Sequence, residues 1–353
     1  MRVYLALVFL IVYKKVESLS IESVTIYDIA REANVSIATV SRVFSASKQV
    51  SEHTKKRVLS VADRFGYRPQ ATAQNLASKK RKNIAIVVPV ISNYFFIELL
   101  EGIQDELSAS DLELNIININ SKENLFEQVE GVLRKRYADA YIFISIHFNL
   151  KEWEALTRYR APIILVDDFY KDFDSVSVDN ITGAYLAVSH FLEQGCKKVA
   201  MLSASSSSKP IKERSKGYLK ALEHFGIPYQ KNLVFELDQT YRDGFTEEAG
   251  YQTMREMLES NMEFDACFCT SDAQAIGALH AMRKMKKVIP IIGFDDIKIA
   301  HYVGLSSMRQ PIHEMGVLAV RKIATKLGKS MKKPSHIIFK PELVVRESSI
   351  INQ

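Results

Sequence analysis

The sequence predicts a small all-α head joined to a larger α/β body, and three observations lead to this fold class. Between Thr25 and Gly66, short amphipathic patterns follow Thr or Ser residues that suit helix N-caps. From Asn83 onward, short apolar runs alternate with amphipathic stretches, which indicates parallel sheets flanked by helices. The net charge also changes sign between the head and the body. Residues 1–82 carry 15 basic and 6 acidic side chains, a net of +9, and the remaining 32 basic and 35 acidic side chains leave −3.

The length and composition fit a protein of more than one domain. A chain of 353 residues leaves room for two or three domains, and its 47% apolar and 25% charged residues are ordinary for a globular protein. The basic head favours a polyanion as the partner of that part alone. No apolar segment is long enough to span a bilayer, so we do not expect a membrane protein.

The N-terminal residues form an apolar run that resembles a short signal-peptide core. The run Val3–Tyr13 is followed at once by Lys14 and Lys15, and no small-x-small cleavage site appears. At about eleven residues, it is too short to cross a membrane. We interpret residues 1–22 as an extension with no role in the fold.

The cysteines are too few for a disulfide framework. Only Cys196, Cys267 and Cys269 are present, which fits a reducing, cytoplasmic setting. Cys267 and Cys269 would share one face of a strand, an arrangement compatible with metal binding. Because no further Cys-His pair has ligand spacing, we favour buried core thiols and expect no metal site.

The first two helices of the head are predicted by their caps and by the turn between them. Thr25 can cap a helix, and Asp28 suits its positive N-terminus. The inner face of this helix would consist of Ile29, Ala30 and Ala33. Asn34 then tolerates the left-handed conformation that a tight turn requires.

The second helix carries the candidate recognition face. Ser36 is its predicted cap, and Val40 and Val43 would point to the core. The outward residues would then be Ile37, Ala38, Ser41 and Arg42, a set suited to the major groove of DNA. The alternative is an ordinary helical hairpin, since caps and small residues are common.

A third helix is predicted from Ser51 to Gly66. It carries the basic run Lys55, Lys56 and Arg57, and its inner face would consist of Val58, Val61 and Phe65. Pro69 can start another helix in the stretch that follows, but that stretch is too short and too poor in apolar residues to be stable in isolation.

The residues from Thr25 to Lys80 resemble the LacI/GalR family of bacterial regulators, and the resemblance extends to about Ser349. It implies that Ala71–Ser78 is a hinge helix that orders on operator DNA, with Leu76 as an apolar wedge in the minor groove. Alternatively, Leu76 is a linker leucine that packs on its own domain. The sequence departs from the family pattern at Asn34, where Gly is common, and at Ser45, where Asn is common.

The resemblance also implies a set of DNA contacts. Ile37 and Ala38 occupy the main base-reading positions, and Arg42 occupies a position that reaches base edges or phosphate. The predicted DNA-binding residues are Thr25, Ser36, Ile37, Ala38, Thr39, Ser41, Arg42, Gln49, Tyr67, Gln70, Ala73 and Leu76.

The body contains short apolar runs that we predict to be strands. They are Ile84–Val90, Leu114–Asn118, Ala140–Ser145, Ile163–Val166, Val199–Ser203, Ala266–Thr270 and Ile289–Gly293. Amphipathic stretches such as Phe96–Ser108 and Ile181–Glu193 lie between them and are predicted helices. Ligands of such folds bind beyond the carboxyl ends of the strands.

Polar and aromatic residues follow several of these strands. They are Ser92, Asn93, Phe95 and Phe96 after the first, Asp167 and Asp168 after the fourth, and Asp295 and Asp296 near the last. Such groups suit sugar hydroxyls and ring faces. Because the sequence has no dinucleotide fingerprint, phosphate loop, nucleophile elbow or metal cluster, we expect neither catalysis nor a cofactor.

The body resembles the effector domain of the same family, which is similar to periplasmic sugar-binding proteins. The resemblance implies two lobes, three crossings (near Val178 and Asp179, near Gln310 and near Phe339), and a ligand in the cleft, with Arg214 and Asp295 as a charged binding pair. The predicted effector contacts are Phe95, Phe96, Asp167, Arg214, Phe245, Asp272 and Asp295. Three alternatives stay open: Arg214 as a surface residue paired with Glu213, the phenylalanines as core, and Asp272 as a helix cap.

These interpretations predict four segments. They are an extension (1–22), a helix-turn-helix domain (23–68), a hinge helix and linker (69–82), and a two-lobed periplasmic-binding-protein-like domain (83–353). Lobe one would comprise about 83–178 and 310–338, and lobe two about 179–309 and 339–353.

The function implied is that of a sequence-specific DNA-binding transcriptional regulator, a repressor of carbohydrate uptake or catabolism genes that a sugar controls. It would bind a pseudo-palindromic operator as a homodimer, because no heptad-bearing tail follows Ser348 to tether a tetramer. Local similarity to catabolite control proteins suggests instead a phosphorylated carrier protein as corepressor. A solute-binding receptor is the remaining alternative, although it would have no use for Thr25–Lys80.

Overall fold

The computed structural model divides the chain into two compact units, Met1–Arg81 and Lys82–Gln353. It describes nine stretches: 24–44, 49–67, 82–89, 93–119, 124–204, 208–236, 244–260, 262–328 and 333–351. The predicted extension, the whole predicted hinge helix Ala71–Ser78, and Ser45 and Ser92 lie outside these residues.

The described part of the first unit consists of three helices, as predicted: α2 (Ile26–Glu32), α3 (Ile37–Phe44) and α4 (Glu52–Arg64). Asn34 adopts the left-handed conformation (φ 48°) in the turn between α2 and α3. The Ser36 hydroxyl accepts a hydrogen bond from Thr39 N, and Ser51 accepts one from Thr54 N, so both predicted caps are present.

A small apolar core holds the three helices together. Its buried members are Ile29, Ala30, Ala33, Val40, Val43, Val58 and Ala62. The prediction that Phe65 belongs to the inner face is wrong, because its side chain is 41% exposed and lies beside the guanidinium of Arg64. Ala62, four residues after Val58, fills the inner face instead, because residues spaced by four lie on the same face of a helix.

The second unit is built on two six-stranded sheets, which confirms the predicted α/β class. In the first sheet, the order is β11 (His336–Phe339), β5 (Asp174–Val178), β4 (Ile163–Val166), β3 (Ala140–Ile144), β1 (Lys82–Val88) and β2 (Leu112–Asn118). In the second, it is β12 (Glu342–Val344), β10 (Ser306–Arg309), β9 (Ile291–Asp295), β8 (Ala266–Cys269), β6 (Val199–Ser203) and β7 (Val234–Glu236). Among the described strands, only β10 and β12 pair antiparallel.

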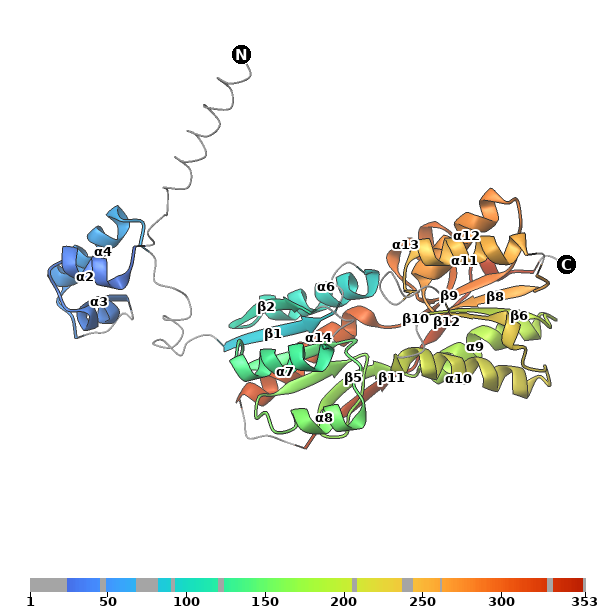
Figure 1. Cartoon of the computed structure of the whole chain (residues 1–353), viewed down its shortest axis with the longest axis horizontal. Helices are drawn as coiled ribbons and strands as arrows, with labels where there is room; N and C mark the ends of the chain where they lie inside the picture. Colours follow the sequence, from blue (N-terminus) through green and yellow to red (C-terminus); the bar gives the residue numbers. More distant parts are fainter. Residues whose placement is uncertain are drawn as a thin grey trace, which may run out of the picture. The chain divides into compact units, whose positions relative to one another are not determined.

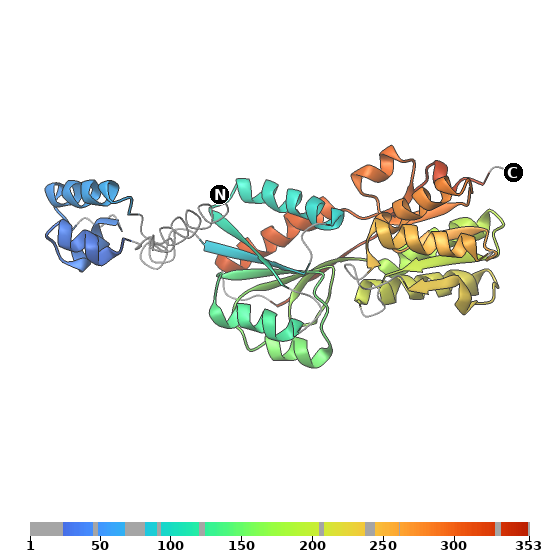
Figure 2. The same cartoon turned by 45° about the horizontal axis from the view of Figure 1, so that its top comes forward.

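Helices cover both faces of each sheet (Figures 1 and 2). On the first sheet, α6 (Tyr94–Ser108) and α14 (Ile312–Gly328) pack on one face, and α7 (Leu125–Lys135) and α8 (Leu150–Leu156) pack on the other. On the second, α9 (Asn180–Glu193) and α10 (Lys209–His224) lie opposite α11 (Glu247–Glu259), α12 (Asp272–Lys284) and α13 (Lys298–Tyr302). Two short 3-10 helices, η1 (Lys231–Leu233) and η3 (Glu347–Ser349), complete the described elements.

The chain passes between the two sheets at three places. It leaves the first sheet after Val178, returns through Gln310 between β10 and α14, and leaves again between β11 and β12. The first and third connections are joined by a hydrogen bond, which Asp179 N donates to Phe339 O. We call the first sheet with its helices lobe one, and the second lobe two.

Five strands are missing from the sequence prediction: β5, β7, β10, β11 and β12. β5 and β10 are rich in serine, so no continuous apolar run reveals them. The β10 hydroxyls are nevertheless buried and bonded, because Ser306 Oγ donates to Arg346 O and Ser307 Oγ donates to Asp272. The last predicted strand, Ile289–Gly293, starts two residues too early, since β9 begins at Ile291.

Two glycines allow α6 and α14 to approach closely in lobe one. A Cβ at Gly102 would lie 2.0 Å from His313 O, and one at Gly316 would lie 2.3 Å from Leu99 O. Both contacts involve backbone atoms, which cannot rotate away as a side chain can.

Gly102→Ala should therefore lower the free energy of unfolding by about 1–3 kcal/mol, as overpacking does. Gly131→Ala is the matched control, because Gly131 lies within α7 and a Cβ there meets nothing within 4 Å. That substitution should raise stability by up to about 1 kcal/mol. Urea denaturation measures the free energy of unfolding of the two variants. Equal changes in both variants would contradict the close approach of α6 and α14.

Candidate functional site

The outward face of α3 is exposed in the head. Ile37 is 42% exposed, and Ala38, Ser41 and Arg42 are exposed as well. The opposite face is fixed by Val40 and Val43, which are buried in the head core. The predicted outward set is therefore on the surface together, where it can contact a groove of DNA.

The other predicted DNA contacts of the head have mixed environments. Thr25 is exposed, and its N–H and hydroxyl both donate to Asp28. Gln49 is also exposed. Tyr67 is half-buried and packs edge-on against Phe44, with ring centroids 5.8 Å apart, so it also holds the head together. Gln70, Ala73 and Leu76 lie outside the described residues and stay predictions.

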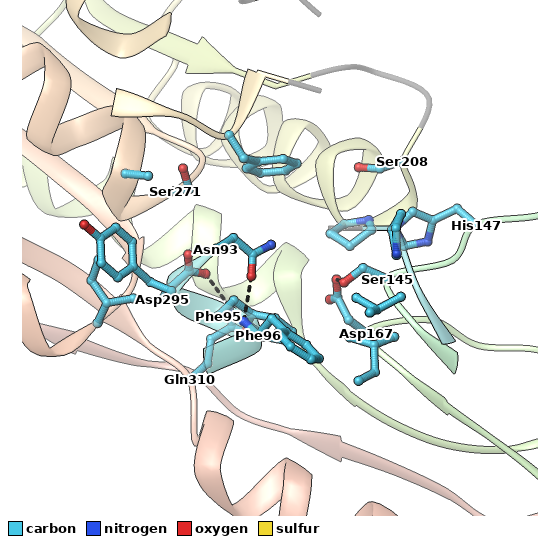
Figure 3. Close-up of a pocket in the computed structure, with 18 of the residues that line it drawn as sticks. Asn93, Phe95, Phe96, Ser145, His147, Asp167, Ser208, Ser271, Asp295 and Gln310 are labelled. Atoms are coloured by element: carbon cyan, nitrogen blue, oxygen red, sulfur yellow. Dashed lines mark hydrogen bonds between the residues drawn. The ribbon is translucent and has the colours of Figure 1, made fainter. Parts of the chain in front are cut away.

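A cavity of about 290 Å³ lies between the lobes of the second unit. Residues at the carboxyl ends of strands line it, as the fold class predicts. Figure 3 shows Ser145, His147 and Asp167 grouped on one side, and Asp295 and Gln310 on the other. Of the predicted effector contacts, the cavity brings together Phe95, Phe96, Asp167, Arg214, Phe245 and Asp295.

Arg214 is the buried cation of the cavity, at 4% exposure. Its Nε donates to Asn180 Oδ1 at 2.9 Å, its Nη1 donates to Thr270 O at 2.5 Å, and its Nη2 lies 3.9 Å from Asp295. The guanidinium also stacks on the Phe294 ring, 3.7 Å from its centroid. Arg214 is thus not a surface residue paired only with its neighbour.

Asp295 ends β9 with a positive φ of 119°, and Gln310 Nε2 donates to its Oδ1 at 2.6 Å. Burial raises the pKa of Asp295 to about 7, while Arg214 and the Gln310 bond oppose the shift and Asp167 adds to it. This carboxyl group therefore changes charge near neutral pH.

Asp167 lies across the cavity, also with a positive φ (63°) and with Ser145 Oγ donating to its Oδ2. Burial raises its pKa as well. The adjacent Asp168 does not line the cavity. Its Oδ2 lies 3.2 Å from His147 Nδ1 and holds that ring at the cavity wall.

The phenylalanines divide between the cavity and the core. Phe96 is fully buried in the core of lobe one and also borders the cavity, so both of its predicted roles apply. Phe95 and Phe245 are half-buried and offer apolar surface. Asn93 caps α6 by accepting from Phe96 N, as Figure 3 shows.

Asp272 does not line the cavity, which differs from the prediction. Its carboxylate is fully buried and accepts hydrogen bonds from Ile297 N and Ser307 Oγ. The cap of α12 is the preceding residue, Ser271, which accepts from Gln274 N and does line the cavity. Asp272 therefore joins β10 and the loop after β9 to α12.

Several lining residues were absent from the predicted set. They are Ser145, His147, Ser208, Glu247, Ser271 and Gln310. Ser145 follows β3 with a positive φ of 49°, so the rule of strand ends could have found it. Ser208 and Glu247 lie at helix N-termini, where no sequence signal distinguishes a lining residue from an ordinary cap.

The thiols of Cys267 and Cys269 are fully buried in the core of lobe two, with their Sγ atoms 3.9 Å apart. Within the described ranges, no three or more side chains of His, Cys, Asp or Glu lie together so that they could hold a metal ion. No helix in that part of the chain is both long and apolar enough to cross a membrane.

Comparison with known families gives matches over nearly the whole chain. Residues 25–70 match the family described as bacterial regulatory proteins, lacI family. Residues 81–333 match the family described as periplasmic binding proteins and sugar binding domain of LacI family.

Characterised relatives are similar over almost their full length. Catabolite control protein A of Priestia megaterium is 33% identical, covering 93% of this chain and 99% of the relative. The HTH-type transcriptional regulator RegA of Clostridium saccharobutylicum is 32% identical, covering 92% and 99%. Among solved structures, a complex of the transcriptional regulator CelR with cellobiose has a TM-score of 0.67 at 25% identity, covering 92% of this chain and 99% of that one.

The raised pKa of Asp295 predicts how stability depends on pH. Because the folded-state pKa of about 7 exceeds the usual 3.8, the unfolded chain releases this proton first. The stabilising contribution is complete below about pH 4 and is lost as the pH rises to about 7.

Asp295→Asn should reduce the loss of stability between about pH 5 and about pH 8, since it removes the titrating group. Urea denaturation at the two pH values measures the free energy of unfolding. The control is Glu263→Gln, which removes an exposed carboxylate paired with Lys198 and should show the same difference in free energy between the two pH values as the wild type. If Asp295→Asn also shows the wild-type difference, Asp295 is not the titrating group.

Proposed function

The chain belongs to the LacI family of DNA-binding transcriptional regulators, and on this premise we propose that it is a repressor of carbohydrate genes whose operator affinity a small sugar controls. The observation that carries the proposal is that an exposed, capped α3 face in a basic unit occurs together with a cavity, lined by polar and aromatic side chains, between two lobes. DNA binding as a homodimer on a pseudo-palindrome places the protein in the cytoplasm and calls for no catalysis.

The DNA-binding step rests on the α3 face. Ile37 and Ala38 present apolar contacts to base edges, and Arg42 supplies a cation at the end of the same helix. The net charge of +9 over residues 1–82 attracts the phosphate backbone and makes affinity depend on salt.

The effector step rests on the cavity, because lining residues come from both lobes. A sugar that contacts Asp167 of lobe one and Arg214 of lobe two favours the arrangement in which both contacts are made. By linkage, a sugar that changes operator affinity must itself bind differently in the presence of operator.

Ala38→Asp should weaken operator binding by at least about tenfold, because it places a carboxylate among the base edges and close to the DNA phosphates. The matched control is Ser60→Asp, which adds the same charge at an exposed position on α4 of the same unit and should keep near-wild-type affinity. The operator is first obtained by selecting, from random-sequence DNA, the duplexes that the full chain binds. A mobility-shift titration with these duplexes then measures the affinity of each variant. Equal losses in both variants would refute recognition by α3.

Arg214→Lys should weaken sugar control while leaving operator binding in place. A lysine lacks the planar fork that reaches Asn180, Thr270 and Asp295 together, so sugar potency should fall by about tenfold or more. Operator affinity of the wild type and the variant is titrated with ribose and with cellobiose. A full sugar response in the variant would exclude Arg214 from the site.

A second candidate is control by a phosphorylated carrier protein. Catabolite control proteins among the relatives favour it. Adding a phosphorylated carrier to the chain and labelled operator separates the two candidates, since a lack of any gain in operator affinity removes the second one.

A further inference from the structure

The cavity carries more negative than positive side chains. Its described lining includes three acidic side chains, Asp167, Glu247 and Asp295, and one arginine, Arg214. Asp295 carries its negative charge above its pKa of about 7, so the charges are compared at about pH 8. The carboxylates come from both lobes, since Asp167 follows β4 while Glu247 begins α11 and Asp295 ends β9. A ligand that bridges the lobes therefore meets carboxylates on each side.

The positive charge of Arg214 is already matched by protein groups. Two of its nitrogens donate to Asn180 and to Thr270 O, and the third faces Asp295. His147, the remaining basic lining group, has Asp168 at its Nδ1. An incoming anion would have to compete with carboxylates that are part of the protein.

The free hydrogen-bonding capacity of the carboxylates also favours donors on the ligand. One oxygen of Asp295 is occupied by Gln310, and one oxygen of Asp167 by Ser145. The second oxygen of each can accept a further bond. Hydroxyl groups supply the donors, whereas phosphate and carboxylate groups are acceptors that repel these oxygens.

We propose that this cavity selects uncharged sugars and rejects sugar phosphates and sugar acids, with Asp167, Glu247 and Asp295 as the groups that discriminate. The inference rests on the proposed sugar control and narrows its ligand class. A phosphate brought near two carboxylates loses about tenfold or more in affinity relative to a hydroxyl at the same place.

The test compares neutral sugars with charged counterparts on the full chain. Ribose, glucose and cellobiose form the neutral set, and ribose 5-phosphate, glucose 6-phosphate and glucuronate form the charged set. Each is added at about 10 mM and about pH 8, where Asp295 is mostly charged, and the rise in the unfolding midpoint reports binding. We expect at least one neutral sugar to raise the midpoint and every charged sugar to raise it less than its neutral counterpart.

The outcomes separate this inference from the proposed function. A charged sugar that stabilises the chain more than its neutral counterpart, and also changes operator affinity, overturns the inference but leaves sugar control standing. If neither set shifts the midpoint or the operator affinity, sugar control fails, and the inference fails with it.

Variants test which carboxylates discriminate. For a neutral sugar that binds, Glu247→Gln and Asp167→Asn should each narrow the affinity ratio between that sugar and its charged counterpart by about threefold or more. Glu263→Gln removes one negative charge from the surface of lobe two and should leave the ratio unchanged. A ratio that changes equally in all three variants overturns the assignment to the cavity carboxylates.

Discussion

The buried guanidinium of Arg214 is the interaction on which the cavity depends. A charge removed from water is tolerated only where hydrogen bonds and opposite charges replace the solvent. Arg214 meets this condition by joining Asn180 at the start of α9, Thr270 O after β8, and Asp295 at the end of β9. These three elements must therefore meet at one point, and that point forms the wall of the cavity in lobe two.

Left-handed backbone conformations direct the opposing groups toward the same space. Ser145 and Asp167 in lobe one, and Asp295 in lobe two, all have positive φ at the ends of strands and line the cavity. Non-glycine residues rarely adopt this conformation unless their surroundings hold it. Here the holding contacts are visible: Ser145 donates to Asp167, and Gln310 donates to Asp295. The strand ends thus turn side chains into the cavity at some cost in backbone energy.

The sequence reveals the head and the apolar strands because their signals are local. Caps at Ser36 and Ser51 and the turn at Asn34 need only neighbouring residues. Serine-rich β5 and β10 were missed because their hydroxyls are satisfied by distant groups, such as Arg346 O for Ser306. Asp272 was misplaced for the same reason: a carboxylate after a strand can serve a ligand or the protein, and only the fold brings Ser307 and Ile297 to it. Local patterns predict elements, whereas long-range partners decide which polar groups remain for a ligand.

The proposed control of the head by the cavity depends on the order of the parts along the chain. Residues 68–81, which include the predicted hinge helix, lead from the head to β1 of lobe one, whereas Arg214 and Asp295 belong to lobe two. Among the described residues, two ion pairs cross between the lobes: the exposed pair of Lys298 with Glu101, which is of modest strength, and the pair of Lys209 with the buried Asp168. A ligand that contacts both lobes adds to these interactions. It therefore shifts the balance between lobe arrangements most strongly when the ion pairs alone leave that balance nearly even.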